Sequence, residues 1–224
     1  MKLFEINDTF ITIFGYPLSY VEFIATFFGL FSIWLATKQV ILTWSTGLIN
    51  IVFSFIIFYQ VQLYSDMFLQ IYFFITNIYG WVIWKKHFQG NRPVTALSRK
   101  TRVLLLILIL ISTIIFGILV KNIHLLFPKV FIHPASFPFI DTLIAVTSII
   151  GTILLAKRII DNWALWLIID MICVVVYALK NIIFISLEYA VFCILACLGL
   201  FSWRKSIRTE KVSYQMNTSA TTSI

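Results

Sequence analysis

Val103-Leu-Leu-Leu-Ile-Leu-Ile-Leu-Ile111 is a run of aliphatic residues without one polar side chain. The run does not alternate between apolar and polar residues, as a strand of a transmembrane β-barrel would. A backbone that lies in hydrocarbon must satisfy its own hydrogen bonds, and a helix does so within one segment. This stretch therefore predicts a membrane-spanning helix, and it indicates an all-α integral membrane protein.

The composition of the whole chain agrees with this prediction. Of 224 residues, 61% are hydrophobic and 12% are charged, whereas a soluble domain carries about 25% charged residues. So few charges would not cover a water-exposed surface, and so apolar a chain is not expected to be disordered. The net charge of +8 comes from Lys and Arg clusters between apolar runs. It indicates orientation in a bilayer rather than nucleic-acid binding.

Seven apolar segments follow one another, each near the length of about 20 residues that a helix needs to cross a bilayer. We expect spans over residues 18–36, 41–60, 66–84, 103–120, 139–156, 163–179 and 185–203. Most of the 17 Lys and Arg residues then fall in loops on one side of the stack. Because cytoplasmic loops carry the basic excess, the sequence predicts a multi-pass membrane protein with an external N-terminus and a cytoplasmic C-terminus.

Rare residues recur at a constant spacing of 119 positions, which indicates an internal repeat. The matched pairs are Glu22/Asp141, Lys38/Lys157, Trp44/Trp163, Gly80/Gly199, Trp84/Trp203, Lys85/Arg204 and Lys86/Lys205. Both copies begin on the outside, so we expect two parallel three-helix repeats joined by an unpaired linker helix. Parallel repeats of this kind occur among transporters. A duplicated membrane scaffold without a pathway is the alternative.

The repeat also divides the chain into parts. We expect an extracytoplasmic segment over 1–17 and the first three-helix repeat over 18–84. A basic cytoplasmic loop, the linker helix and an extracytoplasmic loop occupy 85–138. The second repeat covers 139–205, and a disordered cytoplasmic tail covers 206–224.

A stripe of polar and aromatic residues follows one face of the expected span 163–179. Its members share one face because they recur at helical spacing, and they are Trp163, Trp166, Asp170, Tyr177 and Asn181. Such a stripe should face the protein interior or a water-filled path. No Lys or Arg lies inside any expected span, so a cationic ligand would supply the charge that Asp170 lacks. A protonated Asp170 that hydrogen-bonds to a neighbouring helix is the alternative.

Amide and aromatic side chains of other spans complete the candidate site. Trp34 and Trp203 fit an interfacial aromatic belt, whereas Trp81 and Trp166 lie about a turn deeper. Tryptophan faces stack on flat rings and hold cations, so we expect a cationic heteroaromatic ligand that bears hydroxyls or an amide. The predicted substrate-binding residues are Asn50, Gln70, Asn77, Trp81, Trp163, Trp166, Asp170, Tyr177 and Asn181.

Several motifs of other classes are missing from the sequence. It contains no GxxxxGK[ST] loop and no HExxH pair, and its three cysteines form no CxxC motif. We therefore expect neither ATP hydrolysis nor a zinc site. No cofactor, metal or nucleic-acid partner is expected, and the chain is not expected to be an enzyme.

Five segments resemble the PnuC-type nicotinamide riboside transporters. They are Gly47-Leu-Ile-Asn50, Gln70 with Asn77-Ile-Tyr-Gly-Trp81, Phe137-Pro-Phe-Ile-Asp141, Asn162-Trp-Ala-Leu-Trp166 and Ser186-Leu-Glu-Tyr189. The resemblance implies a SWEET-like 3+1+3 helix bundle and facilitated diffusion of nicotinamide riboside across the lipid bilayer. It also implies that a cytoplasmic riboside kinase traps the product. By resemblance the pathway is lined by Asn50, Gln70, Asn77, Trp163, Trp166 and Tyr177.

The resemblance leaves the choice of vitamin open. Close relatives take up thiamine, which is also a cationic heteroaromatic molecule. The resemblance places discrimination at Asp170, because some riboside-specific members carry an amide there. A non-transporting scaffold is the alternative of a different class, and the oligomeric state is open, a homo-oligomer included.

Overall fold

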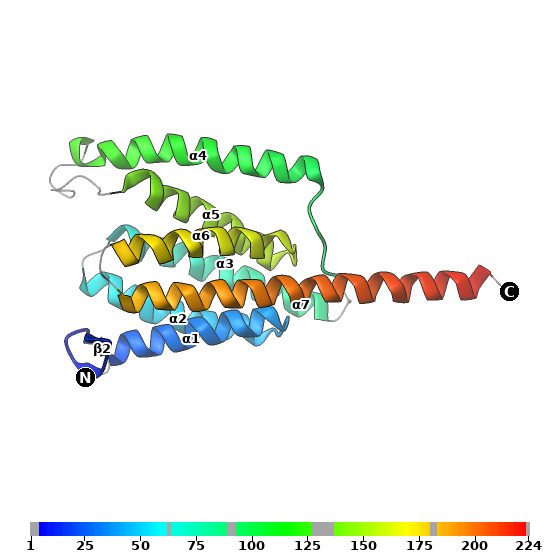
Figure 1. Cartoon of the computed structure of the whole chain (residues 1–224), viewed down its shortest axis with the longest axis horizontal. Helices are drawn as coiled ribbons and strands as arrows, with labels where there is room; N and C mark the ends of the chain where they lie inside the picture. The colour runs from blue at the N-terminus through cyan, green and yellow to red at the C-terminus, as the bar shows by residue number, and fades with distance from the viewer. Residues whose placement is uncertain (1–4, 62–63, 89–92, 127–136, 180–182, 223–224) are drawn as a thin grey trace.

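Seven α-helices lie side by side in the computed structural model, with a short β-hairpin at one end of the bundle (Figure 1). The structure describes residues 5–61, 64–88, 93–126, 137–179 and 183–222. The helices are α1 (Tyr20–Thr37), α2 (Leu42–Gln60), α3 (Tyr64–Phe88), α4 (Arg99–Leu126), α5 (Pro138–Ala156), α6 (Asp161–Leu179) and α7 (Ile183–Thr222). The hairpin pairs β1 (Thr9–Ile13) with the antiparallel strand β2 (Tyr16–Ser19).

Six of these helices are long and apolar enough to cross a membrane. The helix not among them is α3, which carries polar side chains such as Gln70 and Asn77 along its length. The prediction of an all-helical membrane protein is confirmed, and each of the seven expected spans overlaps one helix, although residues 18 and 19 of the first expected span belong to β2.

The N-terminal hairpin was not expected from the sequence. The chain turns at Phe14 and Gly15, which both have positive φ angles of 49° and 81°. Directly after β2, Ser19 caps α1: its hydroxyl accepts a hydrogen bond from the Glu22 amide at 3.3 Å, and the Ser19 amide donates to the Glu22 carboxylate at 2.9 Å. This capping box fixes where the hairpin ends and the first helix begins.

The tail over 206–224 differs from its prediction. It was expected to be disordered, but α7 continues through it to Thr222 (Figure 1). The composition of this segment explains the helix. Residues 206–222 contain neither Gly nor Pro, so nothing in them breaks the helix that arrives from the apolar segment.

Backbone geometry also recurs at the spacing of 119 positions. Gln39 follows α1 and Arg158 follows α5, and both have a φ of 58°. In each turn the next amide bonds to a carbonyl five residues back, at 3.1 Å from Val40 to Leu35 and at 2.9 Å from Ile159 to Leu154. The two connections are therefore the same turn.

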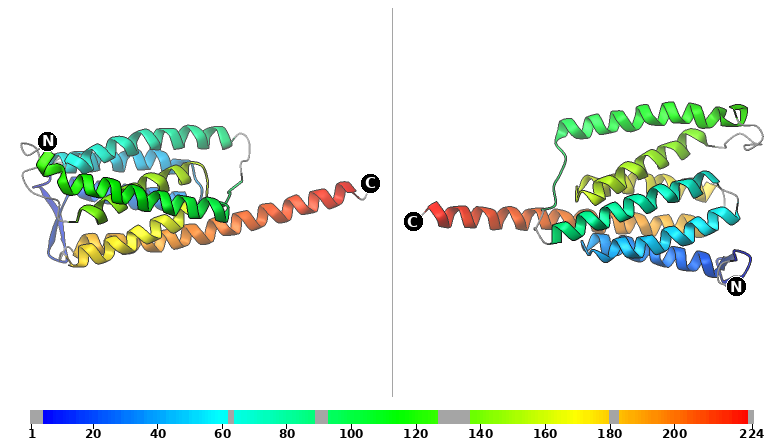
Figure 2. Two further views of the ribbon diagram at one scale, coloured as in Figure 1. Left: turned by 90° about the horizontal axis from the view of Figure 1, so that it is seen from above. Right: turned by 180° about the vertical axis from the view of Figure 1, so that it is seen from behind.

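Helix packing also recurs at the spacing of 119 positions. The pairs α1–α2 and α5–α6 match one another, as do α2–α3 and α6–α7. Contacts also cross between the two sets of helices, where α1 packs on α7 and α5 packs on α3. The remaining helix, α4, packs on α5 and lies along the outside of the bundle (Figure 2).

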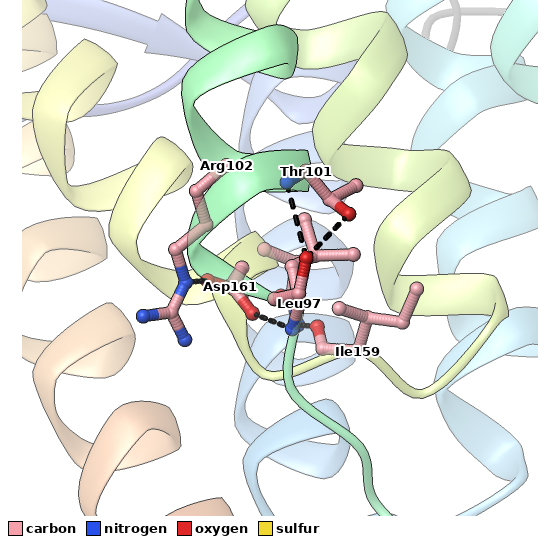
Figure 3. A network of polar contacts seen from close by, with 7 residues as sticks. Leu97, Thr101, Arg102, Ile159 and Asp161 are labelled. Atoms are coloured by element: carbon pink, nitrogen blue, oxygen red, sulfur yellow. Dashed lines mark hydrogen bonds and ion pairs between the residues drawn. The ribbon is translucent and has the colours of Figure 1, made fainter.

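The segment between α3 and α4 is attached to the α5–α6 turn. The Thr95 amide donates to the Arg158 carbonyl at 3.1 Å, and the Ile160 amide donates to the Thr95 carbonyl at 2.9 Å. The Asp161 carboxylate accepts hydrogen bonds from the Leu97 amide at 2.8 Å and from the Arg102 guanidinium at 2.5 Å (Figure 3). Sequence analysis did not anticipate these contacts.

Four tryptophans form the core at the end of the bundle where these turns lie. Trp44 packs edge-on against Trp84, with ring centroids 5.4 Å apart, and Trp163 packs edge-on against Trp203 at 5.7 Å. Trp84 and Trp203 are fully buried and lie 6.4 Å apart. We call these four residues the tryptophan cluster.

The prediction that Trp203 belongs to an interfacial belt is therefore wrong. Its exposed fraction is 0%, and its indole N–H donates to the Ala36 carbonyl at 3.0 Å. The physical reason is the contact between α1 and α7, which covers the ring. Trp34, which was also assigned to a belt, is 43% exposed.

Candidate functional site

A cavity of about 230 Å³ lies among six of the helices. Helices α1, α2 and α3 provide one wall and α5, α6 and α7 the other, while α4 contributes none of the described lining. The lining residues that the argument below uses are Ser32, Trp44, Gly47, Asn50, Gln70, Asn77, Trp163, Trp166 and Asp170.

The lining residues show the spacing of 119 positions found in the sequence. Seven pairs of them are 119 positions apart: Ile33/Thr152, Ala36/Leu155, Trp44/Trp163, Gly47/Trp166, Ile51/Asp170, Phe73/Phe192 and Asn77/Ala196. Trp44 and Trp163 carry the same side chain, whereas Asp170 corresponds to the apolar Ile51. The two walls of the cavity therefore carry matched positions but differ in the chemistry of their side chains.

Asp170 is the acidic group of the cavity. It lies in the middle of α6 with an exposed fraction of 5%. Among the described residues it has no hydrogen-bond partner and no basic partner. The ion pair found among the described residues joins Arg102 to Asp161, which lie outside the cavity. A buried carboxylate without a counter-ion is costly in its charged form. The cavity can therefore hold a cation.

Two amide side chains project from α2 and α3. The Asn50 amide donates to the Ala25 carbonyl at 2.8 Å, which orients its side chain. The Asn77 Oδ1 atom is buried and accepts no hydrogen bond from the described residues. Both amides line the cavity together with Gln70, so the wall opposite Asp170 offers neutral donors and acceptors.

Aromatic rings supply the remaining surface. Trp166 packs on Gly151, where an added Cβ would lie 3.2 Å from the ring. The indole N–H groups of Trp44 and Trp163 are buried without a partner among the described residues. A flat cation could stack on such rings, and acceptor atoms of a ligand could accept hydrogen bonds from the two indole N–H groups.

The predicted site residues divide into three groups. Those that line the cavity are Asn50, Gln70, Asn77, Trp163, Trp166 and Asp170. Two others lie elsewhere: Trp81 is 39% exposed, and Tyr177 stacks on Tyr189 with ring centroids 5.5 Å apart. Asn181 lies outside the described residues.

Trp81 does not line the cavity, although it follows Asn77 by one turn of α3. The neighbouring Gly80 lies under the Trp44 ring, which packs on it. Trp81 itself is 39% exposed.

Sequence analysis missed other lining residues, chiefly Ser32, Trp44, Gly47 and Thr152. One signal could have found Trp44, since it is the repeat partner of Trp163. The hydroxyl and glycine positions carry no such signal, because short side chains are common in membrane helices.

Comparison with known proteins gives the family. The model of the family described as "Nicotinamide mononucleotide transporter" matches residues 19–205. The chain belongs to this family. It is therefore a multi-pass membrane protein of a transporter family, and its named relatives are transporters rather than enzymes.

Curated relatives agree over most of their length. The nicotinamide riboside transporter PnuC of Escherichia coli (strain K12) is 32% identical over 212 residues, which cover 87% of this chain and 89% of that one. The protein of the same name from Neisseria mucosa is 20% identical over 203 residues, with 86% and 74% covered.

A solved structure shares the fold. The crystal structure of the vitamin B3 transporter PnuC matches with a TM-score of 0.68 at 18% identity, covering 85% of this chain and 83% of that one. The helical arrangement described above is thus one that a transporter of this family adopts.

Proposed function

We propose that this protein takes up nicotinamide riboside by facilitated diffusion, without ATP or a coupled ion. The single observation that carries the proposal is Asp170, a buried carboxylate without a basic partner among the described residues, in a cavity lined by tryptophans and amides. Nicotinamide riboside combines a pyridinium cation, a carboxamide and a ribose, and each finds complementary chemistry there. The names of the relatives support the same substrate.

The ligand's parts have separate partners in the proposal. The pyridinium ring stacks on Trp166 and lies near Asp170, because a desolvated cation gains from both a ring face and a carboxylate. Asn50, Gln70 and Asn77 bind the carboxamide and the ribose hydroxyls. Trp163 closes the cavity beside its repeat partner Trp44.

We further propose that the helices form a SWEET-like 3+1+3 bundle of two parallel repeats with α4 as the linker. The matched turns, the matched packing and the absence of α4 from the described lining support this arrangement. The end that carries Lys38, Lys85 and Arg204 is cytoplasmic in the proposal, since basic residues collect on that side. The membrane is then the bacterial inner membrane, and a cytoplasmic riboside kinase traps the product.

The test is counterflow into liposomes that contain the purified protein. Preloaded unlabelled riboside should drive uptake of labelled riboside in the absence of ATP and of any ion gradient. No counterflow would reject the proposal, and a non-transporting scaffold would then be the better interpretation. Tryptophan fluorescence during a riboside titration checks binding separately, because three tryptophans line the cavity.

Thiamine is the second candidate substrate, and Asp170 is the observation that favours it. A carboxylate pairs with the thiazolium cation as well as with a pyridinium. A titration with thiamine, followed by tryptophan fluorescence in the same way, decides between the two vitamins. Only the true substrate should change the tryptophan fluorescence at low concentration.

A further inference from the structure

Gly47 lies on α2 at a point where neighbouring side chains leave no room for a larger residue. A Cβ atom at this position would lie 2.9 Å from Oδ1 and 3.3 Å from Nδ2 of Asn77, and 3.1 Å from Oγ of Ser32. These atoms are the ends of side chains that line the cavity. An added methyl group would therefore move the Asn77 amide within the cavity and leave the helix backbones in place.

The orientation of that amide matters, because the Asn77 Oδ1 atom is a buried acceptor that is unpaired among the described residues. We infer that Gly47 is a positioning residue: it lets the Asn77 carboxamide lie against α2 so that Oδ1 accepts a hydrogen bond from an N–H or O–H group of the substrate. The inference rests on the proposed function, and it adds the means by which the backbone sets the direction of the acceptor.

A double-mutant cycle tests this inference through the dissociation constant, measured by tryptophan fluorescence with whichever of riboside and thiamine the wild type binds. Gly47→Ala and Asn77→Ala should each weaken binding about 10-fold, the usual size of one hydrogen-bond loss. The double variant should bind no more weakly than Asn77→Ala alone, because both changes remove the same bond.

Additive losses, or an unchanged affinity of Gly47→Ala, would overturn the inference. Thr46→Ala serves as the control, since the Thr46 hydroxyl bonds only to carbonyls of its own helix in the described contacts. The thermal midpoint of Gly47→Ala should match the control. Wild-type protein that binds neither vitamin would overturn the proposed function together with this inference, whereas additive losses overturn the inference alone.

A second feature joins the two repeats at the basic end of the bundle. The Trp84 indole N–H of α3 donates to the Ala156 carbonyl at the end of α5, at 3.1 Å. Trp203 of α7 makes the equivalent bond to Ala36 near the end of α1, at 3.0 Å. Each bond crosses from one repeat to the other, and the tryptophan cluster packs between them. Trp44 and Trp163 of this cluster also line the cavity, so the cluster borders the cavity.

The two equivalent turns meet outside the cluster. The Arg158 guanidinium donates a hydrogen bond to Oε1 of Gln39, and it lies over the Trp84 ring at 5.3 Å from the centroid. The repeat places these two residues at equivalent positions, 119 apart. Two arginines there would repel each other, so the difference between Gln39 and Arg158 is what allows a charge-assisted bond.

The strand-like segment around Thr95 then covers the Arg158 turn through its backbone hydrogen bonds. We propose that the pair Gln39–Arg158 is a latch that holds the basic end of the pathway shut, and that it must separate before a ligand leaves the cavity on that side. This proposal rests on the proposed function but is carried by contacts outside the binding cavity.

Two substitutions at one position test the latch, because Gln39→Glu should strengthen the pair and Gln39→Arg should repel Arg158. The reporter is Ser32→Cys in the cavity, with Cys173, Cys193 and Cys197 replaced by Ala. An impermeant maleimide is applied to inside-out and right-side-out membrane vesicles. From the basic side, labelling should be at least 5-fold faster with Gln39→Arg and slower with Gln39→Glu than with the parent.

Equal rates in all three proteins would overturn the latch. Gln60→Glu is the matched control at the opposite end, where Gln60 accepts a hydrogen bond from the Ile6 amide at 2.9 Å. If Gln60→Glu changed the labelling rate as much as Gln39→Arg does, that result would also overturn the latch. If Gln39→Arg fails to fold, the slower labelling of Gln39→Glu decides alone. The readout needs no substrate, so a failure of the proposed function appears in counterflow and not here.

Discussion

Asp170 and Ile51 are 119 positions apart in the sequence, and both line the cavity. Since α2 packs with an apolar residue at the matching position, helix packing alone does not require an acid there. A carboxylate in the second repeat lowers stability unless something pairs with it. The residue is therefore explained by a ligand more readily than by packing.

This argument predicts the behaviour of Asp170→Asn. The amide keeps the shape of the side chain but loses its charge, so binding of a cationic vitamin should weaken by about 2 kcal/mol or more, roughly 30-fold. Binding of a neutral isostere with an uncharged ring should change much less. Isothermal titration of both ligands against both proteins measures the difference, and equal losses would remove the counter-ion role.

Two glycines give a contrasting prediction about stability. A Cβ atom at Gly80 would lie 2.3 Å from the buried Trp44 ring, and one at Gly199 would lie 2.4 Å from the Trp163 ring. Neither ring can move without disturbing the tryptophan cluster, so each Gly→Ala change should cost about 3 kcal/mol.

Thermal unfolding in detergent, followed by tryptophan fluorescence, checks this cost. Gly47→Ala is the matched control, because its added methyl group meets only the flexible end of Asn77 and of Ser32. A Gly80→Ala protein as stable as this control would contradict the packing that we describe.

At the scale of residues, sequence reasoning predicted the kinds of side chain in the cavity, but not for every residue whether it lines the cavity. The stripe of Trp163, Trp166 and Asp170 was predictable, because rare polar residues in an apolar helix must face inward. The position of Trp81 outside the lining was not, although Trp81 lies one turn from Asn77 on α3. Helical spacing gives the face of a residue, but not how far along the helix a cavity extends.

At the scale of elements, the Tyr16 side chain is one of the contacts that join the hairpin to α1. The Tyr16 hydroxyl donates to the Glu22 carboxylate at 2.6 Å, and its ring stacks on Phe184 of α7 at 5.2 Å. Burial is the largest cause, and the hydrogen bond to Glu22 the second, that raises the pKa of Tyr16 above its ordinary value of about 10. The folded protein thus favours the neutral phenol.

The sign of the pH effect follows. A group whose pKa is raised by folding contributes stability that is complete below the unfolded value and is lost at higher pH. Thermal stability of the wild type should therefore fall as the pH rises above about 10, and Tyr16→Phe should reduce that slope. Unfolding midpoints between pH 8 and 11 measure it. Tyr59→Phe, at a residue 63% exposed, is the control, and an unchanged slope in Tyr16→Phe would be the contrary result.

The elements that sequence analysis misjudged lie at the two ends of the chain. Helix positions followed from apolar runs, which report contact with lipid. The hairpin and the distal part of α7 are polar or mixed, so hydropathy carried little information about them. Turn residues such as Gly15 and the lack of helix breakers after Lys205 were the usable signals.

At the scale of the whole molecule, the spacing of 119 positions predicted more than any single motif. The matched turns and the pairs of lining residues occur at the same spacing, although the sequence analysis did not name them. The spacing could not predict that Thr95 pairs with the α5–α6 turn, since that segment has no counterpart in the other repeat. Contacts outside the repeat depend on how α4 connects the two halves.

The last prediction concerns orientation in the membrane. Exposed basic residues occur near the end of α3, at the start of α4 and in α7: Lys85, Lys86, Arg99, Arg204 and Lys205. The segment that joins α3 to α4 lies at the end of the bundle from which α7 extends (Figure 1). Since cytoplasmic loops carry the excess of Lys and Arg, a reporter fused to the C-terminus should remain in the cytoplasm. Alkaline phosphatase, which is active only outside, should therefore be inactive after Ile224, while a fluorescent protein that folds only inside should fluoresce.

The reciprocal fusions before the hairpin should give the opposite pattern, with an active phosphatase and a dark fluorescent protein. The design separates orientation from span count. An even number of crossings would place both termini on one side, and a reversed insertion would exchange the two patterns. Active phosphatase at the C-terminus would therefore place the basic end outside, and the exit that we assign to the Gln39–Arg158 latch would become the entrance.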